Sequence, residues 1–382
     1  MRPAIAQLSG SRIREVANAG LGRADVLAFW FGESDEVTPA PVRDAAAASL
    51  QRGETFYSHN LGLPELRQAI ADYTASLHPA VGMDRVAVTS SGVSGLMIAM
   101  QMLAGAGDEV VAVVPVWPNL TAQPEILGAT VRRVSLRPRD GAWRLDLDEL
   151  LAAVTARTSV LLVNAPNNPS GWTLTRDEQA VLLAHCRRTG TWIVADEVYE
   201  RVWFGAGAAA PSFLDVAGPE DRLVVVHSFS KSFLMTGWRL GWLVLPASHV
   251  DAVGKLLEYN SSCSPVFVQR GAQAALADAD VTVPALVQRL RAGRDRLLAG
   301  LLALPGVTAA RPEGGMYAFF RVDGQDDSLA LAKRLVRDQG LGLAPGVAFG
   351  PEGEGWLRWC FATHRLERLD DGLRRLGRAL AL

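Results

Sequence analysis

A single lysine in a short polar turn is the residue of this chain best suited to covalent chemistry. Lys231 follows an apolar run at 223–226. The hydroxyl side chains of Ser228 and Ser230 precede it, and Arg239 comes after it on the same connection. A lysine amine becomes nucleophilic towards a carbonyl when its surroundings lower its pKa. Hydroxyls and a guanidinium are common partners of a phosphate. The turn could therefore hold an aldehyde cofactor as a Schiff base while binding the cofactor's phosphate.

The segment at 228–241 reads SFSKSFLMTGWRLG. It resembles the pattern S-x-S-K-x-x-x-x-x-G-x-R-x-G of the class I/II aminotransferases, the fold-type I family of pyridoxal-phosphate enzymes, at every fixed position. The resemblance implies that Lys231 binds pyridoxal 5'-phosphate and that Ser228 and Arg239 contribute to its binding. Taken alone, Lys231 would be an ordinary solvated lysine, because most lysines are exposed.

Two segments further upstream resemble the family's cofactor site. Ser91-Gly92-Val93 follows a strand candidate and opens a helix, whose free backbone N–H groups can hold a phosphate. The family has its phosphate loop here, often with a polar side chain where Val93 stands. Trp117 matches the aromatic residue that stacks on the pyridine ring. Without the resemblance, Ser91 would be a helix cap and Trp117 a packing residue.

Two more motifs follow strand candidates. The segment NAPNNPSG at 164–171 matches the family signature N-x-P-N-N-P-[ST]-G, and ADEVY at 195–199 comes after another strand. The resemblance implies that Asn168 and Tyr199 share the cofactor's phenolic oxygen. It also implies that Asp196 pairs with the protonated pyridine nitrogen, which keeps the ring an electron sink. No role is assigned to Glu197.

Four residues are candidates for binding the substrate or completing a dimeric site. Arg358 lies among aromatic residues in an apolar strand, where an arginine is costly without an anionic partner. The resemblance implies that this partner is the substrate's α-carboxylate, with Asn168 beside it and Gly32 in an arm that closes over it. Tyr57 resembles a tyrosine that reaches the phosphate of the neighbouring subunit, which implies a homodimer with shared active sites.

The order of the elements predicts an α/β fold. Strand candidates at 86–88, 109–114, 130–134, 159–163, 191–194, 223–226 and 240–245 alternate with helical patterns such as 64–77, 94–103 and 176–188. This alternation predicts a mainly parallel sheet sandwiched by helices. After about residue 275, helices at 287–304, 328–338 and 365–380 and strands at 316–322 and 356–361 predict a smaller α+β domain.

The domain limits combine these patterns with the family resemblance. We expect a large cofactor-binding domain at 41–275. A small domain would be formed by 276–382 together with the N-terminal arm at 1–40, because the arm folds with the C-terminal lobe in the resembled family.

Composition and charge exclude several other classes. The net charge of −2 argues against a nucleic-acid partner. The apolar runs are too short to span a membrane, and the six histidines form no metal-binding motif. The odd number of widely spaced cysteines, Cys186, Cys263 and Cys360, favours reduced thiols in the cytoplasm.

The resemblance to this family implies a pyridoxal-phosphate-dependent aminotransferase that moves an amino group between an amino acid and a 2-oxo acid by a ping-pong mechanism. Lys231 would also be the general base of the reaction. One alternative is a lyase that catalyses β- or γ-elimination on the same fold. A non-catalytic cofactor-binding regulator is a second, less favoured one. The sequence does not identify the amino donor, and no second arginine can be aimed at a distal carboxylate.

Overall fold

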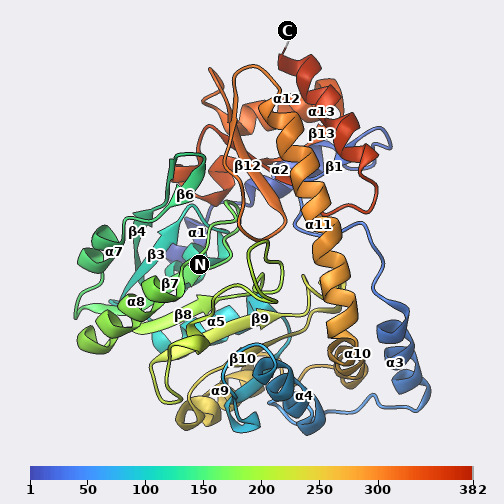
Figure 1. The fold of residues 1–382 in the computed structure, drawn as a ribbon. Helices are drawn as coiled ribbons and strands as arrows, with labels where there is room; N and C mark the ends of the chain where they lie inside the picture. The colour runs from blue at the N-terminus through green and yellow to red at the C-terminus, as the bar shows by residue number, and fades with distance from the viewer. Residues whose placement is uncertain (381–382) are drawn as a thin grey trace.

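A seven-stranded sheet forms the centre of the larger part of the molecule (Figure 1). The computed structural model describes residues 1–380. The strands are β2 (Val86–Thr89), β3 (Glu109–Val114), β4 (Thr130–Ser135), β7 (Thr158–Asn164), β8 (Trp192–Asp196), β9 (Leu223–Ser228) and β10 (Gly241–Val244). Their order in the sheet is β2-β10-β9-β8-β7-β3-β4. Only β10 runs antiparallel to its neighbours, so the expected mainly parallel sheet is confirmed.

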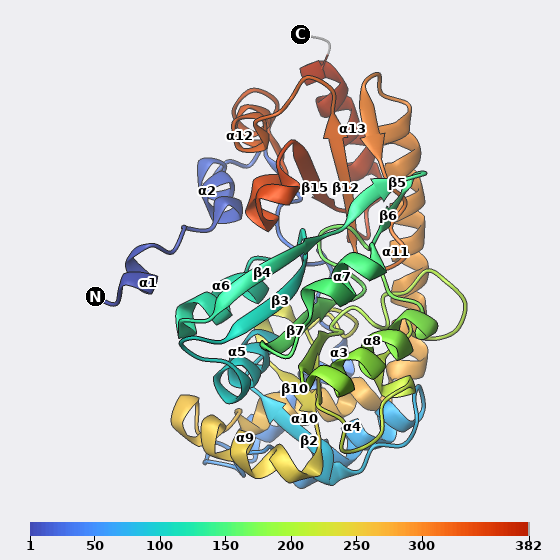
Figure 2. The ribbon, with the colours of Figure 1, turned by 90° about the vertical axis from the view of Figure 1, so that its left-hand side faces the viewer.

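Helices cover both faces of this sheet (Figure 2). One face carries α5 (Gly92–Leu103), α6 (Asn119–Leu127) and α9 (Ala247–Asn260). The other carries α4 (Pro64–Ala75), α7 (Leu147–Ala153), α8 (Arg176–Thr189) and α10 (Val266–Ala277), with α3 (Ala40–Gln51) packed on α10. In β3, Val110 and Ala112 face the first group of helices, and Val111 and Val113 face the second. Burial on both faces explains why the strands read as continuous apolar runs.

A smaller antiparallel sheet lies above the first in Figure 1. Its order is β11 (Val307–Ala309), β12 (Tyr317–Val322), β15 (Trp356–Cys360) and β14 (Ala344–Pro345). The helices α11 (Ala279–Leu302), α12 (Ser328–Gln339) and α13 (Glu367–Leu380) accompany it. The long helix α11 runs from α10 to the small sheet and so connects the two parts of the molecule (Figure 1).

The N-terminal arm lies against this C-terminal part. Helix α2 (Arg12–Ala19) packs on α12, as Figure 2 shows, and β1 (Leu27–Ala28) pairs in parallel with β13 (Leu341–Gly342). The short helix α1 (Pro3–Ala6) precedes α2. The expected domain limits at 40 and 275 stay a prediction, and residues 381 and 382 of the expected small domain lie outside the described range.

Several boundaries differ from the expected ones. Helix α11 begins at Ala279 instead of 287 and contains Pro284. Val283 and Leu286 are buried in the core, and this packing outweighs the single backbone hydrogen bond that a proline removes. The hairpin of β5 (Arg137–Arg139) and β6 (Ala142–Arg144) was not predicted, because its strands are only three residues long.

Two features of the structure are relevant to the expected cytoplasmic location, the state of the cysteines and the character of the helices. All three cysteines are free thiols. Within residues 1–380, no helix is both long and apolar enough to cross a membrane. The cytoplasmic location stays a prediction.

Candidate active site

A cavity of about 400 Å³ lies where the carboxyl ends of the large sheet's strands meet the small sheet. Strands β7, β8 and β9 are parallel neighbours, so the residues at and just beyond their ends meet at one edge. Eleven of the residues singled out in the sequence line this cavity: Gly32, Gly92, Val93, Trp117, Asn168, Asp196, Tyr199, Ser228, Lys231, Arg239 and Arg358. The cavity therefore brings together segments that the sequence spreads over more than 300 residues.

Two predicted residues are not part of the cavity wall. Ser91 instead caps α5, where its Oγ accepts a hydrogen bond from the backbone N–H of Ser94 over 3.0 Å. Tyr57 is 89% exposed. Its expected position across a subunit interface stays a prediction.

Lys231 lines the cavity in an environment that favours the neutral amine. Its Nζ donates a hydrogen bond to the backbone carbonyl of Gly32 over 2.6 Å and lies 5.6 Å from the centre of the Tyr199 ring. Burial, together with the positive charges of Arg358 and Arg239, lowers the pKa of Lys231 to about 8. A lysine with such a pKa is partly unprotonated at neutral pH, as nucleophilic attack on an aldehyde requires.

Asp196 presents a carboxylate that the described chain compensates only weakly. It is the last residue of β8 and is almost completely buried. One backbone N–H, that of Val198, donates to its Oδ1 over 3.4 Å. Burial raises the pKa of Asp196 to about 7, although that hydrogen bond and the charge of Lys231 act in the opposite direction. A cationic group in the cavity would stabilise the ionised carboxylate.

One end of the cavity is suited to an anion. The N-terminus of the 12-residue helix α5 faces it at Gly92 and Val93. A Cβ atom on Gly241 would lie 2.6 Å from the backbone nitrogen of Gly92, so this close approach requires glycine. Arg239 also lines the cavity, and its backbone is left-handed, with φ of 53°. Free N–H groups of a helix and a guanidinium are typical phosphate ligands.

Arg358 is a buried cation on β15 without a carboxylate partner among residues 1–380. Its Nη1 donates to Asn168 Oδ1 over 2.9 Å, and its Nη2 donates to the carbonyl of Trp30. The guanidinium lies 4.3 Å from the centre of the Tyr317 ring and 4.8 Å from that of Phe349. Its Nε is buried and makes no hydrogen bond within the described chain. A bound carboxylate would supply the missing charge and acceptor.

Sequence reasoning missed several residues of the cavity wall. Tyr317 is buried beside Tyr199, and their hydroxyl oxygens lie 2.7 Å apart. Arg14 of α2 and Glu33 also line the cavity, so an arginine besides Arg358 and Arg239 reaches it. No local motif marks these three residues, because only the packing of the arm and β12 on the large sheet brings them here.

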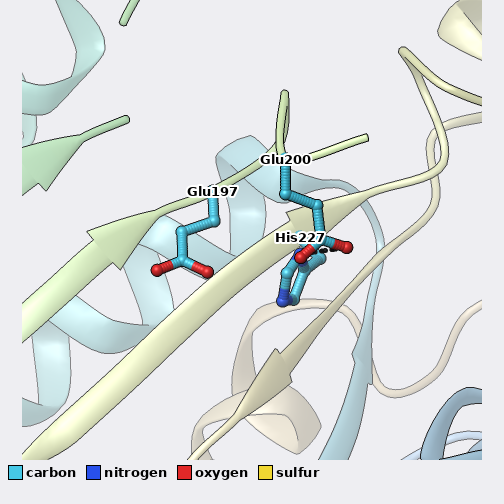
Figure 3. A group of neighbouring side chains, drawn as sticks. All are labelled: Glu197, Glu200 and His227. Carbon is cyan, nitrogen blue, oxygen red and sulfur yellow. Dashed lines mark ion pairs between the residues drawn. The ribbon is translucent and has the colours of Figure 1, made fainter. Parts of the chain in front are cut away.

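Glu197, which had no assigned role, is not part of the cavity wall and lies beside a buried ion-pair network. Its carboxylate accepts hydrogen bonds from Ser212 Oγ over 2.5 Å and from the backbone N–H of Phe213 over 2.9 Å. Glu200 and His227 lie next to it, as Figure 3 shows. Ligand atoms of these three residues lie within 4.8 Å of one another, which is a spacing found around metal ions.

The network already contains its own cation. His78 Nε2 lies 3.2 Å from Glu200 Oε2, and its Nδ1 lies 2.8 Å from Asp215 Oδ1. Burial lowers the pKa of His78, but the hydrogen bonds with Asp215 and Glu200 outweigh it and raise the pKa to about 10. Since protonated His78 and neighbouring donors engage the carboxylates, we interpret the group as a structural ion-pair network rather than a metal centre.

Comparisons with known proteins identify the family of the chain. The sequence profile of the family described as "Aminotransferase class I and II" matches residues 26–376. The chain is 34% identical to arginine–pyruvate transaminase AruH of Pseudomonas aeruginosa over 87% of this chain and 85% of that protein. It is 33% identical to an aspartate aminotransferase of Thermotoga maritima over 92% and 90% of the two chains.

Solved structures are similar over nearly the whole chain. An aspartate aminotransferase of Thermus thermophilus superposes with a TM-score of 0.91 at 28% identity and 99% coverage of both chains. N-Succinyldiaminopimelate aminotransferase of Mycobacterium tuberculosis gives a TM-score of 0.92, again at 28% identity and 99% coverage of both. With its family profile, its relatives and its fold in agreement, this chain belongs to the class I and II aminotransferases and is an amino-group-transferring enzyme.

Proposed function

We propose that the cavity around Lys231 is the active site in which this enzyme moves an amino group between an amino acid and a 2-oxo acid in two half-reactions of a ping-pong mechanism. The observation that supports this most is the position of Lys231. Its amine, with the pKa lowered to about 8, lies in one cavity with two other groups. These are the carboxylate of Asp196, which is only weakly compensated, and the guanidinium of Arg358, which has no carboxylate partner within residues 1–380.

The residues of the cavity fit pyridoxal 5'-phosphate, the cofactor on which this family depends. Asp196 would pair with a protonated ring nitrogen, which would compensate its buried charge. The α5 N-terminus, with Ser228 and Arg239, would bind the phosphate. Trp117 would cover the ring, and Asn168 and Tyr199 would bind its phenolic oxygen. When bound, the cofactor supplies an electron sink that makes the substrate's Cα proton acidic.

The chain's own residues would then position the substrate and move the proton. Arg358 binds the α-carboxylate through its planar guanidinium, and this fixes the Cα atom near Lys231. Val93 contributes only its backbone and an apolar side chain to the phosphate end. Lys231 Nζ would be the base that takes the proton from Cα of the bound substrate.

Reduction with borohydride tests the covalent role of Lys231. The chain has only three lysines, Lys231, Lys255 and Lys333. Lys255 is largely exposed and Lys333 pairs with Glu15, so neither shares the environment of Lys231. After loading with pyridoxal phosphate and reduction, peptide mass spectrometry should find the adduct on Lys231. Lys255→Ala is the matched control and should keep it. An adduct on Lys255 or Lys333 alone, or none at all, would refute the proposal.

The amino donor can be found with a screen that uses the charges of the cavity wall. Arg14 and Glu33 line it with opposite charges, and the relatives are named for aspartate and for arginine. Aspartate, glutamate, arginine and apolar amino acids should be tested with pyruvate and 2-oxoglutarate as acceptors. Arg14→Ala should weaken use of anionic donors, and Glu33→Gln should weaken use of cationic ones. If neither variant changes kcat/KM for a donor, Arg14 and Glu33 do not contribute to the recognition of that donor.

We also propose that the active unit is a homodimer with shared sites. Support comes from Tyr57, a large aromatic residue that is 89% exposed, next to Phe56, which is 84% exposed. Two adjacent exposed aromatic side chains favour a surface that another chain covers. An isologous interface would create two equivalent sites, each with residues from both chains.

A further inference from the structure

We propose that Tyr317 is a positioning residue whose hydroxyl makes Tyr199 a hydrogen-bond donor towards the cofactor, while its ring supports the substrate-binding guanidinium of Arg358. This inference rests on the proposed function and goes beyond it, because it assigns two separable tasks to one residue that no motif marks.

Tyr317 contacts the three parts of the site that must act together. Its hydroxyl lies 2.7 Å from that of Tyr199. Its ring lies beneath the guanidinium of Arg358 at 4.3 Å. A Cβ atom on Gly32 would lie only 1.9 Å from its hydroxyl, so the arm can pass here only with glycine. The carbonyl of the same Gly32 accepts the hydrogen bond of Lys231.

The ring of Tyr317 and its hydroxyl have separate roles. Tyr317 begins β12, which pairs with β15, the strand that carries Arg358. A phenylalanine ring would fill the same buried space and lie equally well beneath a cation. The hydroxyl would then be an added buried polar group, which is costly without a partner. Tyr199 Oη is the only hydrogen-bond partner of this hydroxyl within residues 1–380.

The role of the Tyr317 hydroxyl follows from the number of protons that the two tyrosines carry. Burial raises the pKa of both tyrosines, that of Tyr317 to about 12, so each keeps its proton. Only one proton can lie between the two oxygens. If Tyr199 donates to Tyr317, it has no proton for the cofactor. If Tyr317 donates to Tyr199, the proton of Tyr199 is free for the phenolic oxygen. An anionic phenolic oxygen favours the second arrangement, and hydrogen bonds in such a chain strengthen one another.

This arrangement affects the basicity of the nitrogen that joins Lys231 to the cofactor. A donor at the phenolic oxygen withdraws negative charge from the neighbourhood of this nitrogen and so lowers its pKa. Loss of the Tyr317 hydroxyl weakens the donation from Tyr199. The pKa should then rise by roughly half a unit to one unit, the range that one neutral hydrogen bond allows.

The experiment uses the cofactor-loaded protein without substrate. The pH midpoint of the cofactor's visible absorption is measured for the wild type, Tyr317→Phe, Tyr199→Phe and the double variant. We expect the midpoint to rise in Tyr317→Phe and to rise further in Tyr199→Phe. The double variant should match Tyr199→Phe, because Tyr317 acts only through Tyr199. An unchanged midpoint in Tyr317→Phe, or a Tyr317 effect that adds fully to that of Tyr199→Phe, would overturn the proposal.

Controls separate this result from folding and from the proposed function. Tyr73→Phe removes another buried tyrosine hydroxyl, which accepts from Arg201 over 2.9 Å outside the cavity, and should leave the midpoint unchanged. Tyr317→Phe should keep the KM for the amino acid, whereas Tyr317→Leu should raise it, since only the second loses the ring beneath Arg358. Equal KM values in these two variants would refute the role of the ring. If the cofactor absorbs in the same way in Lys231→Ala as in the wild type, the proposed function itself would instead be refuted.

Discussion

Arg358 and Asn168 are 190 positions apart in the sequence, and yet Arg358 Nη1 donates a hydrogen bond to Asn168 Oδ1 over 2.9 Å. Arg358 comes from the small sheet, and Asn168 lies just beyond the end of β7 in the large one. If their proposed roles are correct, this one contact joins the residue that binds the substrate to a residue that binds the cofactor. It also fixes the small sheet against the large sheet at the point where the reaction would occur.

The role of Arg358 predicts a loss that depends on the substrate. Arg358→Lys keeps the charge but loses the planar pair of donors. One charged hydrogen bond is worth about 1.5–3 kcal/mol, so kcat/KM for amino acids should fall roughly 10- to 100-fold. Cofactor binding, measured by absorbance, should persist. An equal loss of kcat/KM with amines that lack a carboxylate would contradict this role.

The buried carboxylate of Asp196 predicts an electronic effect. Asp196→Ala should retain part of the cofactor through Lys231 and the phosphate contacts, but it no longer keeps the ring nitrogen protonated. Turnover should fall at least roughly 100-fold, which corresponds to a lost charged interaction of about 3 kcal/mol. Single-turnover kinetics on protein with known cofactor occupancy would measure it. Near-normal turnover would remove Asp196 from the mechanism.

The ion-pair network around His78 predicts a pH-dependent stability. The pKa of His78 is raised in the folded protein, from 6.5 to about 10. Its contribution to the free energy of unfolding is therefore complete below about pH 6.5 and is lost as the pH rises towards 10. Urea unfolding should show this decrease in the wild type between pH 7 and 10.

The variant His78→Gln should lose this pH dependence. It should also be less stable by about 3–5 kcal/mol at pH 7, because Glu200 and Asp215 would lose their buried cation. His364→Gln is the matched control. His364 pairs with Asp35 over 2.8 Å but is half exposed, so its loss should cost less than about 1 kcal/mol. Equal losses of stability in the two variants would contradict the structural role of the buried network.

The proposed dimer predicts that two impaired chains can restore activity together. Tyr57→Phe would lack a phosphate contact across the interface, and Lys231→Ala would lack the covalent anchor. A mixed dimer contains one site with an intact Lys231 and an intact Tyr57 from the partner. Activity should therefore exceed that of either parent variant after the chains exchange.

This test requires that the Tyr57→Phe homodimer keeps less than half of the wild-type activity, because a mixed dimer has only one intact site of two. It also requires that mixed dimers are isolated with two affinity tags. Mixed dimers with no more activity than the parents would show that Tyr57 does not act across the interface.

Local sequence determined the covalent candidate and most of the cavity wall. Lys231, Asp196 and Asn168 each lie at or just beyond the end of a buried strand of the large sheet, and parallel strands bring such residues together at one edge. Motif and strand position together therefore placed them in one cavity, which the structure shows. The sheet itself was predictable, because burial on both faces leaves a continuous apolar run in each strand.

Tertiary structure alone decided how the arm and the small sheet complete the site. Tyr317 meets Tyr199 across 118 positions, Lys231 meets Gly32 across 199, and Glu200 and His78 are paired across 122. A sequence pattern records which faces of an element are buried, but it does not record which distant side chain lies opposite. These partners follow from the packing of one sheet on another, where a buried hydroxyl or charge must find whatever donor or acceptor the fold brings to it.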